Sequence, residues 1–285
     1  MTAIVDLNET LELGTDGSSA EFVEFYRSDR AANSQLVTVS GNFVSFWRLD
    51  GQPGAATAVP TTAAALTRTT AGALKQANPT GSKQKWLVRA EITAQSNLTT
   101  FWLYDRLLHC GGLSGTDTNP QSVGGSIGRY TGAAAAGNFI FAEIYTQIGN
   151  TPTTITASYT NQDGASATTK AVAIGGSGRR EAHTWIQLPF ADGDTGARAV
   201  ASVTLAGSTG TAGNFGVTIG HRLASFHIAL GGSAVLAGGM TSIRNFLTEP
   251  LGPVEVLTDA CLALAGVTHG TRAPIVSGQL AFLEK

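Results

Sequence analysis

The feature that most restricts the fold is a succession of short runs in which apolar and polar residues alternate, each followed by a turn sequence. In the run 86–93 (WLVRAEIT) the even-numbered residues are apolar and most of the others are polar, as in a strand with one buried face. Similar runs occupy residues 99–103, 139–148, 153–160, 170–174, 184–190, 197–205, 214–219 and 224–230. Turn sequences such as Gly149-Asn150 and Asp163-Gly164 separate them. Because no helical pattern is interleaved, the sequence predicts an all-β fold, either a β-sandwich or a jelly-roll-like domain.

The N-terminal part carries the main helix signal. Ser18 can act as an N-cap while Glu21, three residues later, completes a capping box. Phe22, Phe25 and Tyr26 then follow at a spacing that places them on one face of a helix. The sequence therefore predicts a short N-terminal helix that presents an aromatic face.

Residues 54–74 (GAATAVPTTAAALTRTTAGAL) form a low-complexity segment with few large side chains to bury. This composition is typical of an extended arm that lies on a neighbouring molecule or is disordered, and a short Ala-rich helix is the alternative. Four regions follow from these patterns, and the last contains a second possible short helix in LTDACLALA (257–265). They are an N-terminal attachment segment (1–53), an arm or linker (54–82), a β-sandwich domain (83–250) and a C-terminal extension (251–285).

The charge balance limits the possible partners. The chain of 285 residues has 18 Lys and Arg against 20 Asp and Glu, a net charge of -2. Near-neutrality argues against a sequence-independent nucleic-acid binder, which needs clustered Lys and Arg. Charged residues make up 13% of the sequence, about half the usual share, which favours a protein packed into an assembly over a free monomer. No apolar run has the length of a membrane span, and the N-terminus lacks the features of a signal peptide, so we expect no membrane partner and synthesis inside a cell.

Cysteine and histidine give no sign of a metal site. Cys110 and Cys261 lack metal-ligand spacing and are expected to be buried free thiols. The histidines do not recur at the spacing that places two ligands on one face. They are His109, His183, His221, His227 and His269.

Two short motifs are candidate sites of chemistry. The GxSxG string Gly124–Gly128 lies between loop-like sequences, whereas a nucleophile elbow needs a strand before the serine and a helix after it. Asp192 and Asp194 lie in a DGDTG sequence that favours a turn, and a bound cation there is left open. The sequence thus predicts no catalytic residues and no cofactor, and we expect the protein not to be an enzyme.

Three segments resemble sequences in virion structural proteins of tailed bacteriophages. They are YDRLLHCGGLSGT (Tyr104–Thr116), TASYTNQDG (Thr156–Gly164) and GDTGARAVASVTLAGSTGTAGNFGVTIGHRLA (Gly193–Ala224). The resemblance extends from about Trp86 to Ala224 and implies a structural role in the virion. Within that role the sequence favours a capsid decoration or cement protein, a homotrimer bound to the major capsid protein on the capsid exterior after assembly in the host cytoplasm.

Two alternatives remain open. One is a tail or tail-fibre component. The other is a carbohydrate-binding module, which needs an exposed aromatic platform, but Trp47, Trp86, Trp102 and Trp185 all lie in predicted strands and are expected in the core. The candidate partner-binding residues are Phe22, Phe25 and Tyr26, which we expect to dock on the shell, on a sister subunit or back on their own domain.

Overall fold

The computed structural model describes residues 20–28, 41–94, 98–228, 240–247, 252–268 and 275–285. The all-β prediction is confirmed: within these residues the chain forms β-strands, with one short 3-10 helix, η1 (Gly132–Ala135). The strands form three antiparallel sheets, which we name A, B and C. No helix in this part of the chain is both long and apolar enough to span a membrane.

Sheet A has the strand order β15-β5-β18-β1-β3, with β16 also paired to β5. Its strands are β1 (Ala20–Ser28), β3 (Asp50–Gln52), β5 (Lys85–Ala94), β15 (Met240–Asn245), β16 (Val254–Val256) and β18 (Ile275–Glu284). Sheet C has the order β10-β9-β13-β7, with β11 also paired to β9. Its strands are β7 (Gln121–Ser122), β9 (Thr153–Asn161), β10 (Ser166–Thr168), β11 (Val172–Ile174) and β13 (Ala197–Leu205).

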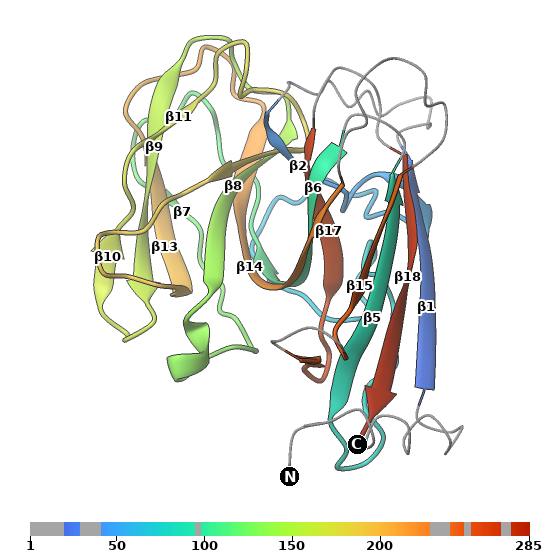
Figure 1. Ribbon diagram of the computed structural model, residues 1–285. Helices are drawn as coiled ribbons and strands as arrows, with labels where there is room; N and C mark the ends of the chain where they lie inside the picture. Colours follow the sequence, from blue (N-terminus) through green and yellow to red (C-terminus); the bar gives the residue numbers. More distant parts are fainter. Residues whose placement is uncertain (1–19, 29–40, 95–97, 229–239, 248–251, 269–274) are drawn as a thin grey trace.

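Sheet B lies between the other two and closes on itself (Figure 1). Its order is β14-β8-β12-β2-β17-β6-β4, and β14 also pairs with β6. All of its strands except the two-residue β4 therefore form a closed antiparallel barrel. The strands are β2 (Phe43–Ser45), β4 (Ala64–Ala65), β6 (Leu98–His109), β8 (Asn138–Thr146), β12 (Thr184–Gln187), β14 (Asn214–His227) and β17 (Leu262–Thr268). Closure removes the exposed edges that an open sheet presents.

The barrel shares a hydrophobic core with each flanking sheet. Phe101 and Leu264 face outward and pack in one cluster with Phe25 and Ile92 of sheet A. On the opposite side, residues of β8 and β14 pack in a second cluster with residues of sheet C. Side chains thus alternate along each barrel strand, so that one set packs in the barrel interior and the other packs in a core shared with a flanking sheet.

The barrel interior has an aromatic part and a polar part. Trp185 packs among rings that include Tyr104, edge-on at 5.0 Å, and Phe141, tilted at 4.6 Å between centroids. Beyond this cluster, the side chains of Arg106 and Glu143 are buried and joined by an ion pair of 2.5 Å. This pair is the charged centre of a barrel that is otherwise filled by rings and small residues.

The predicted N-terminal helix is wrong, because residues 20–28 form strand β1. This strand lies between β18 and β3 and pairs with β18 along its entire length. Burial alternates along it: Val23 and Phe25 are in the core while Phe22 and Tyr26 are exposed. Hydrogen bonding to two distant segments outweighs the local capping signal. Ser18, the predicted cap, lies outside the described residues.

The second predicted helix, at 257–265, is also wrong. Its last residues belong to β17, which pairs with β2 and β6 in the barrel wall. The residues before it form a turn in which Asp259 has a φ of 60°. Strands of the predicted N- and C-terminal regions thus pair with each other and with strands of 83–250, as β18 does with β1 and β5.

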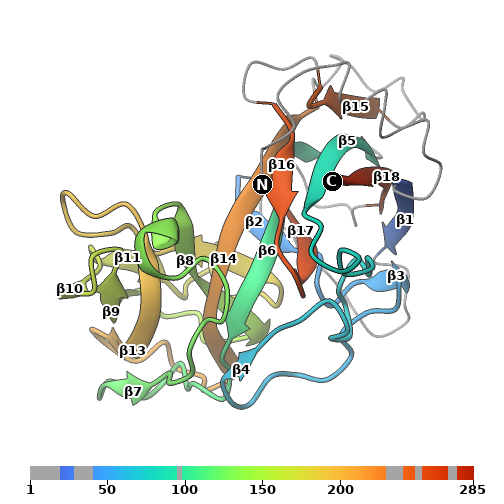
Figure 2. The same cartoon turned by 90° about the horizontal axis from the view of Figure 1, so that it is seen from below.

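The predicted arm, residues 54–82, packs on its own chain, and we call it the strap. It runs from β3 past β4 and returns to β5 (Figure 2). Leu66 and Leu74 are buried, and their backbone N–H groups donate to Leu107 O (3.1 Å) and Leu262 O (2.8 Å). Gly111 permits the contact with the barrel, since a Cβ there would lie 2.1 Å from Pro60 O. The strap is thus held on the barrel by a few buried side chains and by backbone hydrogen bonds.

Three histidines make the stability of this fold sensitive to mild acid. Burial, together with the nearby charges of Arg106, Arg48 and Arg222, lowers the pKa of His109, His183 and His221 to about 4. Their ordinary pKa is 6.5, so between these two values the unfolded chain binds protons that the folded chain does not. The contribution of these histidines is complete above pH 6.5 and is lost as the pH falls toward 4.

We therefore expect the free energy of unfolding to fall between pH 6.5 and pH 5, by up to about 1.4 kcal/mol per pH unit for each histidine. Urea unfolding at a series of pH values measures this slope. His183→Gln, which removes the most buried of the three, should reduce the slope by about one proton. A stability that is flat over this range would contradict the burial of these rings.

Candidate functional site on the outer face of sheet A

The three residues predicted to bind a partner do not lie on one surface. Phe22 and Tyr26 project from the exposed face of β1, with 64% and 39% of their surface accessible. Phe25 points to the opposite side and is only 4% exposed, because it packs in the core between sheet A and the barrel. Gly278, its partner on β18, leaves room for this ring, since a Cβ there would lie 2.6 Å from Phe25 Cζ. Phe25 is therefore corrected to a core residue.

The strand register defines the face that Phe22 and Tyr26 share. Residues paired across neighbouring strands point to the same side of a sheet, so Ile243, Glu91, Gln279 and Glu24 form one row across the exposed side. A second row contains Phe22 and a third contains Tyr26. We call this surface the outer face: Phe22, Glu24, Tyr26, Arg89, Glu91, Thr93, Thr241, Ile243, Asn245, Ser277, Gln279 and Ala281.

The outer face has a polar middle and apolar groups toward two sides. Phe22 and Tyr26 lie on β1 and Ile243, 55% exposed, lies on β15, with β5 and β18 between them. These are the large hydrophobic residues that are exposed among the residues the structure describes. Between them lie Glu24 and Glu91, the latter paired with Arg89 at 2.9 Å.

A shallow open hollow of about 350 Å³ occupies the middle of sheet A on this side. Its lining is Glu24, Phe25, Glu91, Thr93, Ser277, Gly278 and Gln279. Such a hollow is too open to enclose a small molecule. Large apolar side chains exposed on one sheet face are instead typical of a surface that contacts another macromolecule.

The GxSxG string has none of the geometry of a nucleophile elbow. Residues 124–128 form a loop, Ser126 is exposed, and no helix follows it directly. The loop is fastened by the next residue, Arg129, whose Nε and Nη2 donate to the buried Asp105 carboxylate at 2.7 Å each. The interpretation of this string as a structural loop agrees with these contacts.

Asp192 and Asp194 do not converge on a common point. Asp192 is paired with Lys170 on the surface. Asp194 accepts hydrogen bonds from Tyr159 Oη and, at 2.8 Å, from Asn161 Nδ2. In the described part of the chain no group of three or more His, Cys, Asp or Glu side chains is placed to hold a metal ion.

The remaining candidates are part of the structural framework. Cys110 and Cys261 are buried free thiols, and burial raises the pKa of both. Trp47, Trp86 and Trp185 are buried, as expected of core tryptophans. Trp102 packs between Phe43 and Phe139 and receives the Arg222 guanidinium at 5.0 Å from its ring. His269 lies outside the described residues. The described tryptophans therefore form no exposed platform for a sugar.

Sequence reasoning missed Ile243. The run 240–245 (MTSIRN) was not among the predicted strands, because its single large apolar residue after the methionine gives no alternation. A lone isoleucine between polar residues was the available signal. It marks the solvent-facing side of β15, whose other exposed positions are Thr241 and Asn245.

Comparison with known proteins adds little. No protein family and no curated protein matches the sequence. Among solved structures, the chain is aligned with "Structure of infectious bursal disease virus Gt strain" at 10% identity, covering 94% of this chain and 82% of that chain. The Gx strain structure gives 10% identity and covers 93% and 80%. The TM-score is 0.19 in both cases, so neither alignment supports a statement about fold or function.

Proposed function

We propose that this chain is a structural protein of a tailed-bacteriophage virion, and specifically a capsid decoration or cement protein that binds the shell through the outer face of sheet A. The observation that carries this proposal is that Phe22, Tyr26 and Ile243, the exposed large hydrophobic residues of the described chain, all lie on one face of sheet A. The resemblance of residues 86–224 to virion structural proteins supports it.

The physical properties of the chain suit a cement protein. A closed barrel held between two sheets is a rigid body. Only 13% of the residues of the chain are charged, which suits a molecule that contacts many neighbours. A protein that binds only the mature shell stabilises that shell by mass action, with a contribution from every bound copy. In a homotrimer on the capsid exterior, each weak contact with the shell would occur three times, related by the three-fold axis.

The outer face also indicates what the major capsid protein would present. Glu24 and Glu91 outweigh Arg89 in charge near the centre of the face. We expect a matching surface with hydrogen-bond donors or a cation at its centre and apolar groups toward its sides. A tail or tail-fibre component is the second candidate, because the same surface would serve there.

Introducing charge on the outer face tests the proposal. Phe22→Asp combined with Ile243→Asp should reduce binding to shells that lack the protein by at least about 10-fold, since it places charges where apolar anchors are expected. Binding is measured by co-sedimentation of the purified protein with such shells. The matched control is Ala201→Asp on the exposed face of β13 in sheet C, which should bind normally. Full occupancy by a folded double variant would refute this assignment of the face.

A further inference from the structure

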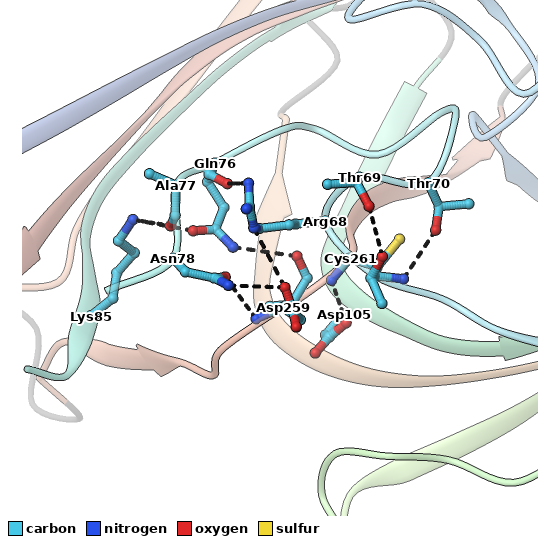
Figure 3. A network of polar contacts seen from close by, with 12 residues as sticks. Arg68, Thr69, Thr70, Gln76, Ala77, Asn78, Lys85, Asp105, Asp259 and Cys261 are labelled. Atoms are coloured by element: carbon cyan, nitrogen blue, oxygen red, sulfur yellow. Dashed lines mark hydrogen bonds and ion pairs between the residues drawn. The ribbon is translucent and has the colours of Figure 1, made fainter. Parts of the chain in front are cut away.

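Lys85 is an amine buried where three parts of the chain meet. Its side chain is 0% exposed, although it lies at the first residue of β5. Its Nζ donates to Glu21 Oε2 of β1 at 2.6 Å and lies 3.6 Å from Glu284 Oε1 of β18. From the strap, Nζ contacts Gln76 Oε1 at 3.1 Å and the carbonyl oxygen of Ala77 (Figure 3).

The Gln76 side chain is held in place beside this amine. Gln76 is buried, and its Nε2 points away from Lys85 toward the carbonyl oxygen of Ala260 at 3.4 Å. Its carbonyl group therefore faces Nζ (Figure 3). The electrophilic carbon Cδ lies one C=O bond, about 1.2 Å, beyond the oxygen that Nζ already contacts. The Phe282 ring, 5.7 Å from Nζ, adds an apolar wall to the site.

An amine, a carboxamide and two carboxylates in one enclosed site are the groups that amide exchange requires. Fixed proximity replaces an encounter in solution and accelerates such reactions strongly. A carboxylate beside the amine can remove its proton and later return a proton to the leaving group. Lysine is a competent nucleophile once it is deprotonated.

We propose that Lys85 and Gln76 are joined by an intramolecular isopeptide bond. Glu21 or Glu284 accepts a proton from the Lys85 ammonium, and the freed Nζ attacks Gln76 Cδ. The tetrahedral intermediate expels the Gln76 Nε2 nitrogen, which takes up a proton from the carboxylic acid and leaves as ammonia. The carboxylate that this regenerates takes the second proton from Nζ, which becomes the nitrogen of the new amide, and releases it to solvent. One C–N bond forms, one C–N bond breaks, and no oxidant or reductant is needed.

The bond would fasten the strap covalently to β5 beside the two terminal strands of sheet A. Glu21 accepts a hydrogen bond from Ala77 N at 2.8 Å, and Glu284 accepts one from Thr80 N at 3.1 Å. The same carboxylates thus position the strap and face the amine. Neither the bond nor its test depends on what the protein binds.

Intact mass of the purified full-length protein is the direct test. The bond predicts a mass lower than that of the sequence by one ammonia, about 17 Da. Trypsin should then yield residues 76–83 linked to residues 84–89, because Lys85 is no longer a cleavage site. The control Lys83→Arg should keep the mass loss, and Lys85→Arg should abolish it.

Glu21→Gln and Glu284→Gln identify the proton carrier, because the variant that lacks it should show the greater fraction of unlinked chain. Two results would overturn the proposal. One is a folded wild-type protein with the mass of its unmodified sequence and normal cleavage after Lys85. The other is a loss of ammonia that persists in Lys85→Arg, which would place the reaction at another residue.

Discussion

Replacing Arg106 by methionine should lower the free energy of unfolding by about 3–5 kcal/mol, because the Glu143 carboxylate then stays inside the barrel without its counter-charge. The two side chains are 0% and 2% exposed and their ion pair measures 2.5 Å. Burial raises the pKa of Glu143, but the charge of Arg106 and the hydrogen bonds from Thr218 and Arg106 lower it by a larger amount, so the net shift is downward. The folded barrel therefore holds a charged carboxylate that depends on this partner.

The double variant Arg106→Met with Glu143→Gln is the matched control. It removes both charges and should recover part of the lost stability, because a neutral amide costs less to bury than an unpaired carboxylate. Chemical denaturation followed by tryptophan fluorescence measures all the variants. A loss below about 1 kcal/mol for Arg106→Met would mean that water reaches Glu143.

Trp185→Ala should destabilise the protein by a similar amount, about 3–5 kcal/mol, because it empties the centre of the aromatic cluster in the barrel. The indole is 3% exposed and lies 4.6 Å from the Phe141 ring and 5.9 Å from the Phe139 ring, centroid to centroid. The control is Phe22→Ala, a large aromatic truncation on the exposed outer face that should change stability by no more than about 0.5 kcal/mol. Equal melting temperatures for Trp185→Ala and wild type would show that the barrel interior is not packed around this ring.

Much of the strand content could be predicted because alternation is a local signal. The run 197–205 coincides with β13, and the run 86–93 lies within β5. Where the alternation of apolar and polar residues is interrupted, the prediction divided one strand into two. Residues 214–219 and 224–230 were predicted as separate strands, but β14 runs without a break from Asn214 to His227. Its register is irregular between Ile219 and Gly220 and between Arg222 and Ala224. A bulge shifts the side-chain phase without ending the strand.

The architecture depends on long-range pairings that no local pattern contains. Phe22 and Tyr26, four residues apart, lie on one face of a helix but equally on one face of a strand. The pairing of β1 with β18 decides between these conformations, and it joins opposite ends of the described chain. Closure of the barrel by the β6–β14 pair is equally invisible to the sequence.

Part of the candidate sites could be anticipated and part could not. The sequence predicted exposed aromatic residues near the N-terminus, and Phe22 and Tyr26 are exposed. Phe25 is buried instead, because in a strand it points to the side opposite Phe22 and Tyr26. The polar clusters were hidden because their members are distant in sequence. Asp105 and Arg106, for example, are adjacent but bond to Arg129 and Glu143, which come from different parts of the fold.

The copy number of this chain in purified particles, with heads and tails separated and counted by quantitative mass spectrometry, tests the proposed role most directly. A decoration protein should travel with the heads at on the order of hundreds of copies per particle, in a number set by the symmetry of the shell. Recovery of roughly a few dozen copies or fewer with the tails would contradict the cement role and favour the tail component. Absence from particles altogether would refute a virion role of either kind.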